Sequence, residues 1–448
     1  MAVGRSISLP ASAVGGAKAL SYIIGAYARI RKQFNLPIGK FEGIETPLGR
    51  VGAFTYIMDA ARTFATATVD AGEKPSVASA IVKCHVTEMG RILACDGMDI
   101  QGGKAICLGP RNTLGRGFQA TPIGITVEGA NVLTRNMIIF GQGALRCHPY
   151  VLPELEAAKL ADPKAALIAF DHAVMKHIGF GISNVVRSFT LALTNSFLVS
   201  TPRSKLKRYY QHATRFSTAL ALFTDVAMMS LGGGLKRKEN ISARLGDVLS
   251  YLYLLSSVLK QHHDQGNPEE DLPVVRYASL FCLCKIQESF NDLLINFPNR
   301  YVAVLMRMLI FPFGMYFAKP RDILSHKIAK LLMAPSGTRD RLAKGTFLTA
   351  CPENYFSVIQ DAFLKTIEAE PIEKIIRQAK KNGEISGYTL KEQAQSALEN
   401  QLITLENFDT FIQAEEAKLK VISVDDFSNE ELAHVLYQKT EDKKQKTA

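Results

Sequence analysis

Apolar residues recur at helical spacing along most of the chain, and no strand-rich stretch long enough for a β-domain interrupts them. In the first third, this pattern predicts helices over residues 11–34, 48–71, 75–100 and 132–144, with an irregular, glycine-rich segment over 104–125. Basic residues gather at the end of the first helix, where cations complement the helix dipole. Four long helices with apolar faces predict an up-and-down bundle.

The same spacing continues beyond Pro149, so we expect a second all-helical region. A glycine triplet at 232–234 and the pair Asn267-Pro268 separate its helices. The sequence therefore predicts an all-α protein with a helical bundle over 1–147 and a helical extension over 148–448. The helices predicted in the extension cover residues 157–180, 183–200, 205–231, 241–260 and 272–297.

Residues 301–317 form the most apolar stretch of the second region. Arg307 and Pro312 interrupt it, and it is shorter than a membrane-spanning helix requires. Apolar runs of this length are usually buried in a protein core, so a bundle segment is the first interpretation. The basic residues at both ends allow a second one, a helix lying in a membrane interface.

Composition narrows the class of protein. At 448 residues, with 47% hydrophobic and 21% charged residues, the chain is long enough for two or three globular domains. Its net charge of +11 suits phosphorylated cofactors or anionic lipid. Tryptophan is absent and aromatic residues do not alternate with basic ones, so we expect no nucleic-acid partner. Seven scattered cysteines without a Cys-x-x-Cys pair predict neither a metal site nor disulfides, and favour a reducing, cytoplasmic location.

The main candidate for chemistry is Glu128, which ends the apolar run 123–127 and precedes Gly129-Ala130. An acid surrounded by apolar side chains is disfavoured as a charge, which is the behaviour of a general base for a weakly acidic carbon proton. A structural interpretation competes with this one. Glutamate in a first helical turn complements the helix dipole and is common for that reason alone.

The segment from Glu128 to Asn131 resembles the catalytic-base segment of acyl-CoA dehydrogenases. Three other segments occur in the order that this family requires: Gly4-Arg5, then 31–39 with its Arg-x-Gln-Phe and Pro-Ile-Gly, then 99–103 with its Gly-Gly turn. The later part of the chain is similar to the long bacterial FadE-type fatty acyl-CoA dehydrogenases. The segments that carry this similarity are 146–150, 207–212, 241–247 and 296–300.

The resemblance implies the first step of fatty acid β-oxidation, in which a fatty acyl-CoA becomes a trans-2-enoyl-CoA and a hydride passes to FAD. In that reaction Glu128 would remove the α-proton, and its backbone N–H would donate to the thioester carbonyl. Gly129 would let the substrate approach the backbone closely. Arg5 would orient the base, although a surface arginine is an equally good interpretation of that residue alone.

The resemblance also implies that Arg31, Gln33 and Phe34 contact the FAD of a neighbouring subunit, with Arg31 on the pyrophosphate. Gly102 and Gly103 would approach its adenosine part. A cationic helix end and a simple C-cap turn are the structural alternatives for these two segments. The family further implies a homodimer or higher homo-oligomer and an electron-transfer flavoprotein as acceptor. The size and apolar character of the second region, with its place in the family, add the expectation that this cytoplasmic protein makes a peripheral contact with the inner membrane.

The chain also departs from the family pattern. Asp99 stands where the Gly-Gly turn usually begins with glutamine. The family's enzymes have a helical domain and a β-domain before the region seen here, so we expect residues 1–448 alone to be inactive and not to retain stoichiometric FAD. The alternative is a non-catalytic helical assembly or membrane-docking protein on the same scaffold, for which Glu128→Gln would change nothing. The extension would serve dimer or membrane contacts.

Overall fold

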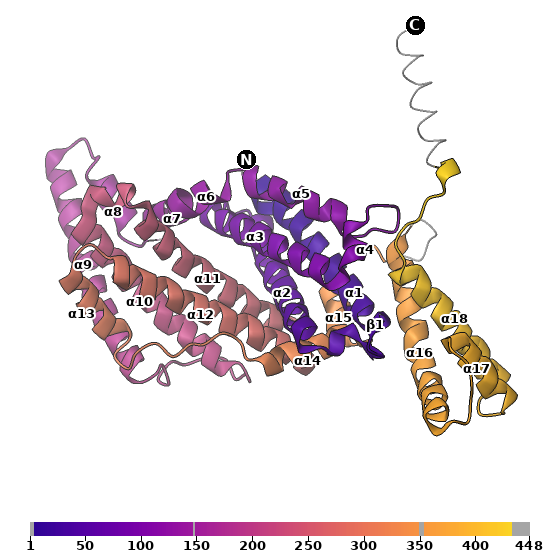
Figure 1. Cartoon of the computed structure of the whole chain (residues 1–448). Coiled ribbons are helices and arrows are strands. Elements are labelled where there is room, and N and C mark those ends of the chain that lie inside the picture. The colour runs from indigo at the N-terminus through magenta and orange to yellow at the C-terminus, as the bar shows by residue number, and fades with distance from the viewer. Residues whose placement is uncertain (1–3, 147, 349–353, 432–448) are drawn as a thin grey trace, which may run out of the picture. The chain divides into compact units, whose positions relative to one another are not determined.

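The computed structural model describes residues 4–146, 148–348 and 354–431. Within these ranges, the only strands are two of two residues each, which pair as one antiparallel hairpin (Figure 1). The predicted all-α fold is therefore confirmed. Contacts within the chain divide it into two compact units. Unit 1 comprises Met1–Gly25, Gly39–Asp96 and Ala120–Thr346, and unit 2 comprises Ala26–Ile38, Gly97–Gln119 and Phe347–Ala448.

Unit 1 is built from long helices that pack side by side (Figure 1). Its first part contains η1 (Gly4–Ser8), most of α1 (Leu9–Ile30), α2 (Glu42–Asp70), most of α3 (Ser76–Gln101), α5 (Gly115–Thr126), α6 (Asn131–Leu133), η3 (Thr134–Ile139) and α7 (Phe140–Arg146). The rest of the unit contains α8 (Val151–Ala157), α9 (Pro163–Leu193), α10 (Lys207–Leu231), η4 (Gly232–Arg237), α11 (Glu239–Asp264), η5 (Glu269–Asp271), α12 (Leu272–Asn296), α13 (Arg300–Ile310), α14 (Asp322–Leu332) and α15 (Gly337–Ala343).

In the centre of unit 1, several helices pack with their backbones close together. Helix α11 packs along α12, and α2 packs against α11, α12 and α14. Side chains attached at Gly25, Gly49 and Gly52 would overlap atoms of α14, so glycine at these positions allows α14 to lie directly against α1 and α2. The bundle and the extension therefore share one core within unit 1.

Unit 2 contains the hairpin of β1 (Lys32–Gln33) and β2 (Leu36–Pro37), followed by η2 (Ile38–Lys40), and also α4 (Gly103–Ile106). Its larger part is a helical group of α16 (Tyr355–Asn382), α17 (Leu390–Glu399) and α18 (Leu405–Ile422). Ile372, Ile376, Phe411 and Ala414 lie in the buried core of this group. Gly383, in a left-handed conformation, ends α16, which is a common way for a helix to stop.

Three predicted elements differ from the observed ones. The first helix ends at Ile30 because the next residues form the hairpin. The segment predicted to be irregular contains α5. Helix α9 runs unbroken through the gap predicted near residue 181, because the two glycines there cost only about 1 kcal/mol each while the helical hydrogen bonds continue. The charged tail from residue 441, for which the sequence predicts a frayed end, lies outside the described residues.

Among the residues that the structure describes, three helices are long and apolar enough to cross a membrane by length and composition. They cover Arg5–Ile30, Pro163–Leu193 and Lys207–Arg237. The first and third have about half of their apolar windows buried inside the protein, whereas the window of α9 is almost wholly exposed. Burial within the bundle therefore explains the apolar character of the first and third, but not that of α9.

Candidate functional site

Glu128 lies in a strained turn between α5 and α6. Its φ is +54°, and that of Gly129 is +93°. A left-handed conformation costs a non-glycine residue about 1–2 kcal/mol, and such strain is concentrated at functional sites. Glu128 also precedes Ala130, the N-cap residue of α6, so it does not lie in a first helical turn as the structural interpretation assumed.

The side chain of Lys83 on α3 stabilises this turn through hydrogen bonds. Its side chain is fully buried, and its Nζ donates hydrogen bonds to the backbone oxygen of Gly129 (2.8 Å), the side-chain oxygen of Asn131 (2.8 Å) and the backbone oxygen of Ile125 (3.3 Å). Burial lowers the pKa of Lys83, and the nearby positive charge of Arg5 lowers it further. One ammonium group therefore connects the residues on both sides of Glu128.

Asn131 extends this connection along α3. Its amide nitrogen donates to Thr87 Oγ1 and Glu88 Oε1, both at 3.0 Å. Asn131 is buried, and so is Thr134, whose hydroxyl donates to the backbone oxygen of Gly129 at 3.3 Å. The conformation of the turn is thus determined by side chains of α3 and of the segment that follows it.

Arg5 lies beside the same turn. A Cβ atom placed on Gly129 would be 3.8 Å from Arg5 Nη2. Glu128 itself is half-buried, and its Oε2 atom is buried. The structure therefore brings Arg5, Glu128 and Gly129 together in unit 1, an arrangement in which an arginine can orient a carboxylate.

The predicted cofactor residues lie in unit 2. Phe34 and Asn35 form the two-residue turn of the hairpin with φ of +50° and +64°, the signature of a type I′ turn. Asparagine tolerates this conformation, but a bulky phenylalanine rarely adopts it. The Phe34 side chain is 88% exposed, and Gln33 is also exposed. A strained, exposed aromatic residue is a feature of surfaces that contact a ligand or another subunit.

Arg31 is joined to the predicted glycine turn through Tyr27. The Arg31 guanidinium donates to the Tyr27 hydroxyl at 3.2 Å, and that hydroxyl donates to the backbone oxygen of Gln101 at 3.4 Å. Gly102 follows with a φ of +60°. Apart from adjoining backbone, no atom of the described residues lies within 4 Å of the positions where Gly102 and Gly103 would carry a Cβ. Unit 2 thus places a cation next to a turn with open space, which fits a pyrophosphate and its attached nucleoside.

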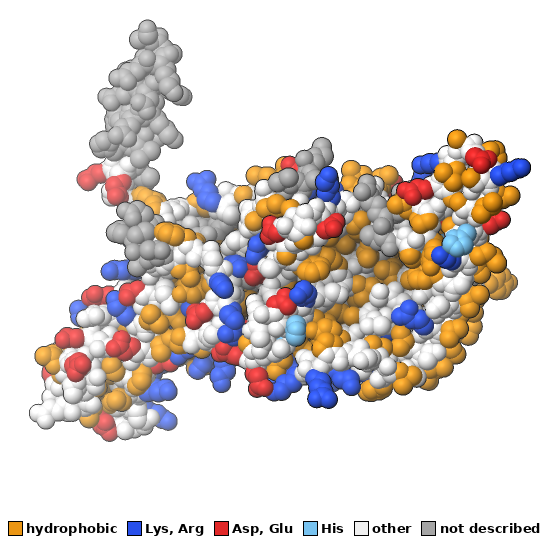
Figure 2. All heavy atoms as spheres, turned by 180° about the vertical axis from the view of Figure 1, so that it is seen from behind, with side chains coloured by type: hydrophobic (Ala, Val, Ile, Leu, Met, Phe, Trp, Pro, Cys, Tyr) orange, Lys and Arg blue, Asp and Glu red, His pale blue; other side chains and the backbone are white. Residues whose placement is uncertain are grey.

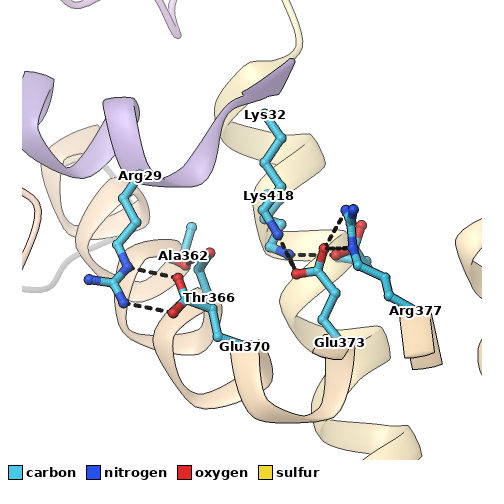
Figure 3. Close-up of polar contacts among 9 residues, drawn as sticks. Arg29, Lys32, Ala362, Thr366, Glu370, Glu373, Arg377 and Lys418 are labelled. Carbon is cyan, nitrogen blue, oxygen red and sulfur yellow. Dashed lines mark hydrogen bonds and ion pairs between the residues drawn. The ribbon is translucent and has the colours of Figure 1, made fainter. Parts of the chain in front are cut away.

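Two acids of α16 neutralise the neighbours of Arg31 (Figure 3). Arg29 makes a bidentate pair with Glu370 at 2.8 and 2.9 Å. Lys32 pairs with Glu373, which is also bound by the Arg377 and Lys418 side chains. Sequence reasoning missed both acids because more than 330 residues separate them from the cations. The two acids pair with Arg29 and Lys32, whereas Arg31 contacts the neutral phenol of Tyr27. The positive charge of Arg31 is therefore not neutralised by these acids.

One polar cluster of the extension, in unit 1, has the composition of a metal site. His148, His177 and Asp225 place ligand atoms within 4.8 Å of one another, a spacing at which metal binding has to be considered. However, His148 Nδ1 accepts from two backbone N–H groups at the start of α8, so its Nε2 carries the proton and donates to Asp225 at 2.8 Å. His177 contacts Asp225 at 3.2 Å and Glu154 at 2.7 Å. These contacts describe a hydrogen-bonded ion-pair cluster.

Comparison with known proteins accounts for both parts of the chain. Residues 2–141 match the family "Acyl-CoA dehydrogenase, C-terminal domain", and residues 145–427 match "Acyl-CoA dehydrogenase, C-terminal, bacterial type". The probable acyl-CoA dehydrogenases FadE10 of Mycobacterium tuberculosis and Mycobacterium bovis are 24% identical over 290 residues. That match covers 62% of this chain and 43% of each relative. The chain thus spans less than half the length of these relatives.

Solved structures show the same fold. An acyl-CoA dehydrogenase from Bacillus anthracis, complexed with FAD, superposes with a TM-score of 0.54 at 18% identity, over 74% of this chain and 55% of that one. Acyl-CoA oxidase 1 from Arabidopsis thaliana gives 0.50 at 13% identity, over 80% and 51%. The bacterial-type match alone covers more than half of the chain. The chain therefore belongs to the acyl-CoA dehydrogenase family, of which it carries the C-terminal helical region.

Proposed function

We propose that this chain provides the catalytic base of an FAD-dependent fatty acyl-CoA dehydrogenase. The observation that supports the proposal is the left-handed turn at Glu128 and Gly129, fixed by Lys83 and Asn131 and flanked by Arg5. A strained turn held by buried hydrogen bonds is costly to maintain, and it presents one carboxylate in a defined position. Family membership supplies the reaction in which such a carboxylate acts.

In this mechanism, the Glu128 carboxylate accepts the proton from the carbon α to the thioester carbonyl. Its backbone N–H donates to the carbonyl oxygen and stabilises the negative charge that develops there. Gly129 leaves room for the thioester beside the backbone, and Arg5 keeps the carboxylate oriented. The flavin, when bound, supplies the acceptor for the hydride that leaves the β-carbon.

The residues of unit 2 suit the phosphorylated part of that cofactor. Arg31 would bind the pyrophosphate through its planar guanidinium, and the open turn at Gly102 and Gly103 would receive the adenosine. Gln33 and Phe34 would contact the same FAD as Arg31, and this FAD would belong to a neighbouring subunit, which requires a homodimer or a higher homo-oligomer. We further propose an electron-transfer flavoprotein as the electron acceptor.

The test uses the complete natural gene product, with any residues encoded before Met1, and measures bleaching of the flavin by an acyl-CoA and formation of the enoyl-CoA. Glu128→Gln keeps the shape of the side chain and removes the base. We expect turnover to fall about 10²–10⁴-fold, with the flavin still bound. Glu73→Gln, at an exposed position between α2 and α3, is the matched control and should leave turnover unchanged. Equal turnover in both variants would refute the proposal and favour a non-catalytic helical assembly.

A further inference from the structure

Helix α9 has its polarity reversed relative to a normal surface helix. Its buried positions hold Ala173, Asn184, Ser188 and Ala192, which are small or polar. Most of its large apolar side chains point outward instead, and six of them are 52–72% exposed: Leu167, Ile168, Met175, Ile178, Ile182 and Val186. A helix in water buries its apolar stripe and exposes its polar one. The outer face of α9 is therefore adapted to surroundings other than water.

The apolar face continues from α9 onto α13, which packs against it. Tyr301, Val304, Leu305 and Met308 of α13 are more than half exposed. The segments that follow the two helices are also in contact, because the Tyr316 hydroxyl donates a hydrogen bond to Asn195 Oδ1 at 2.7 Å. We call this continuous area the α9–α13 surface. Figure 2 shows hydrophobic side chains gathered over this end of unit 1, on the right of the view.

The charges around the α9–α13 surface are mostly basic, and Asp171 is the one acid within α9. Between Asp171 and Asp225 the sequence contains no acidic residue, but it has seven lysines and arginines. Residues 300–321, which include α13 and the segment after it, contain four basic residues and no acid. An apolar face bordered mainly by basic residues is typical of helices that lie in the interface of an anionic membrane.

We propose that the α9–α13 surface binds to an anionic lipid membrane, with α9 and α13 lying in the plane of the interface. Pairing with the same surface of a second copy is disfavoured, because a two-fold contact would bring two predominantly basic borders together. Lys176 and Arg187 are exposed along α9, and the inner face of α9 remains attached to α8 and α10. These features match a helix on the membrane better than one across it. The proposal rests on this surface alone and is independent of the proposed catalysis.

The experiment measures co-sedimentation of the 448-residue chain with vesicles of phosphatidylcholine, with and without phosphatidylglycerol. We expect binding to the anionic vesicles that weakens as salt is added. The double variant Ile182→Gln, Val186→Gln should bind at least about tenfold more weakly, because each change withdraws more than half of a large apolar side chain from the lipid. Both side chains are exposed, so circular dichroism and thermal unfolding should match the wild type.

The matched control is the double variant Leu405→Gln, Leu419→Gln, which alters comparably exposed apolar residues on α18 and should bind like the wild type. Absence of vesicle binding at low salt would overturn the proposal, as would equal loss of binding in the two double variants. Binding that ignores phosphatidylglycerol would remove the electrostatic part of the argument and overturn it as stated. If the wild type instead self-associates through Ile182 and Val186 without binding lipid, the occupant is a second copy and the proposal fails.

Discussion

Replacing Lys83 by methionine tests whether one buried ammonium determines the conformation of the Glu128 turn. Methionine is an unbranched side chain of similar length that can occupy the same buried position, but it donates no hydrogen bond. The substitution leaves the Asn131 side-chain oxygen without its 2.8 Å donor. It leaves the Gly129 backbone oxygen with only the longer bond from Thr134. The loss is therefore confined to the residues that flank Glu128.

The magnitude follows from these contacts. A hydrogen bond to a charged group contributes about 1.5–3 kcal/mol, and two short ones are lost. Removal of a fully buried lysine also relieves the desolvation that lowers its pKa, which offsets part of the loss. A net destabilisation of about 2 kcal/mol remains, equivalent to a roughly 30-fold increase in local opening.

Hydrogen–deuterium exchange of residues 125–134 in the 448-residue chain measures this opening directly. Lys18→Met is the matched control. Lys18 is also nearly buried in unit 1, where it contacts Asp59 at 3.0 Å and the backbone oxygen of Lys344 at 2.9 Å. It should lower the overall stability of the unit without a selective effect on 125–134. Unchanged exchange there in Lys83→Met, or equal acceleration in both variants, would show that Lys83 does not hold the turn.

Three further outcomes are expected. Glu373→Gln removes the buried carboxylate that Lys32, Arg377 and Lys418 share, while Lys418 keeps its pair with Glu415, and should lower the free energy of unfolding of unit 2 by about 2 kcal/mol in a urea titration at neutral pH. Burial acts to raise the pKa of Glu373, but the hydrogen bond from Lys32 outweighs it, so the pKa is lowered overall. The stability that Glu373 contributes should therefore be fully present above about pH 4.5 and lost as the pH falls through the folded pKa. Although burial acts to lower it, hydrogen bonds to two carboxylates raise the pKa of His177. The stability it contributes is thus fully present below about pH 6.5 and lost as the pH rises through its folded pKa, which urea titrations of wild type and His177→Gln should show. Phe34→Gly removes a left-handed strain and an exposed ring, so the chain should gain about 1 kcal/mol in thermal unfolding; a loss of stability would mean that the ring packs in the folded protein.

Helical periodicity was enough to predict the all-α fold, because most helices of the chain pack one apolar face into a core. Local sequence was also enough to select Glu128, since an acid before Gly-Ala after an apolar run is visible in one segment. It could not predict the left-handed φ of Glu128, which depends on Lys83, 45 positions earlier on another helix. Nor could it predict that α9 turns its apolar residues outward, because periodicity gives the spacing of a stripe and not the side that faces the core.

The extension contributes to each unit in a different way. In unit 2, Glu370 and Glu373 bind Arg29 and Lys32, so the cations on either side of Arg31 are already paired. Without these acids, three adjacent positive charges would repel one another, and a phosphate ligand could bind any of them. With them, one guanidinium remains to set the position of the ligand. The extension therefore reduces the charge of the predicted cofactor segment, and in unit 1 it supplies the apolar surface that a bundle alone would lack.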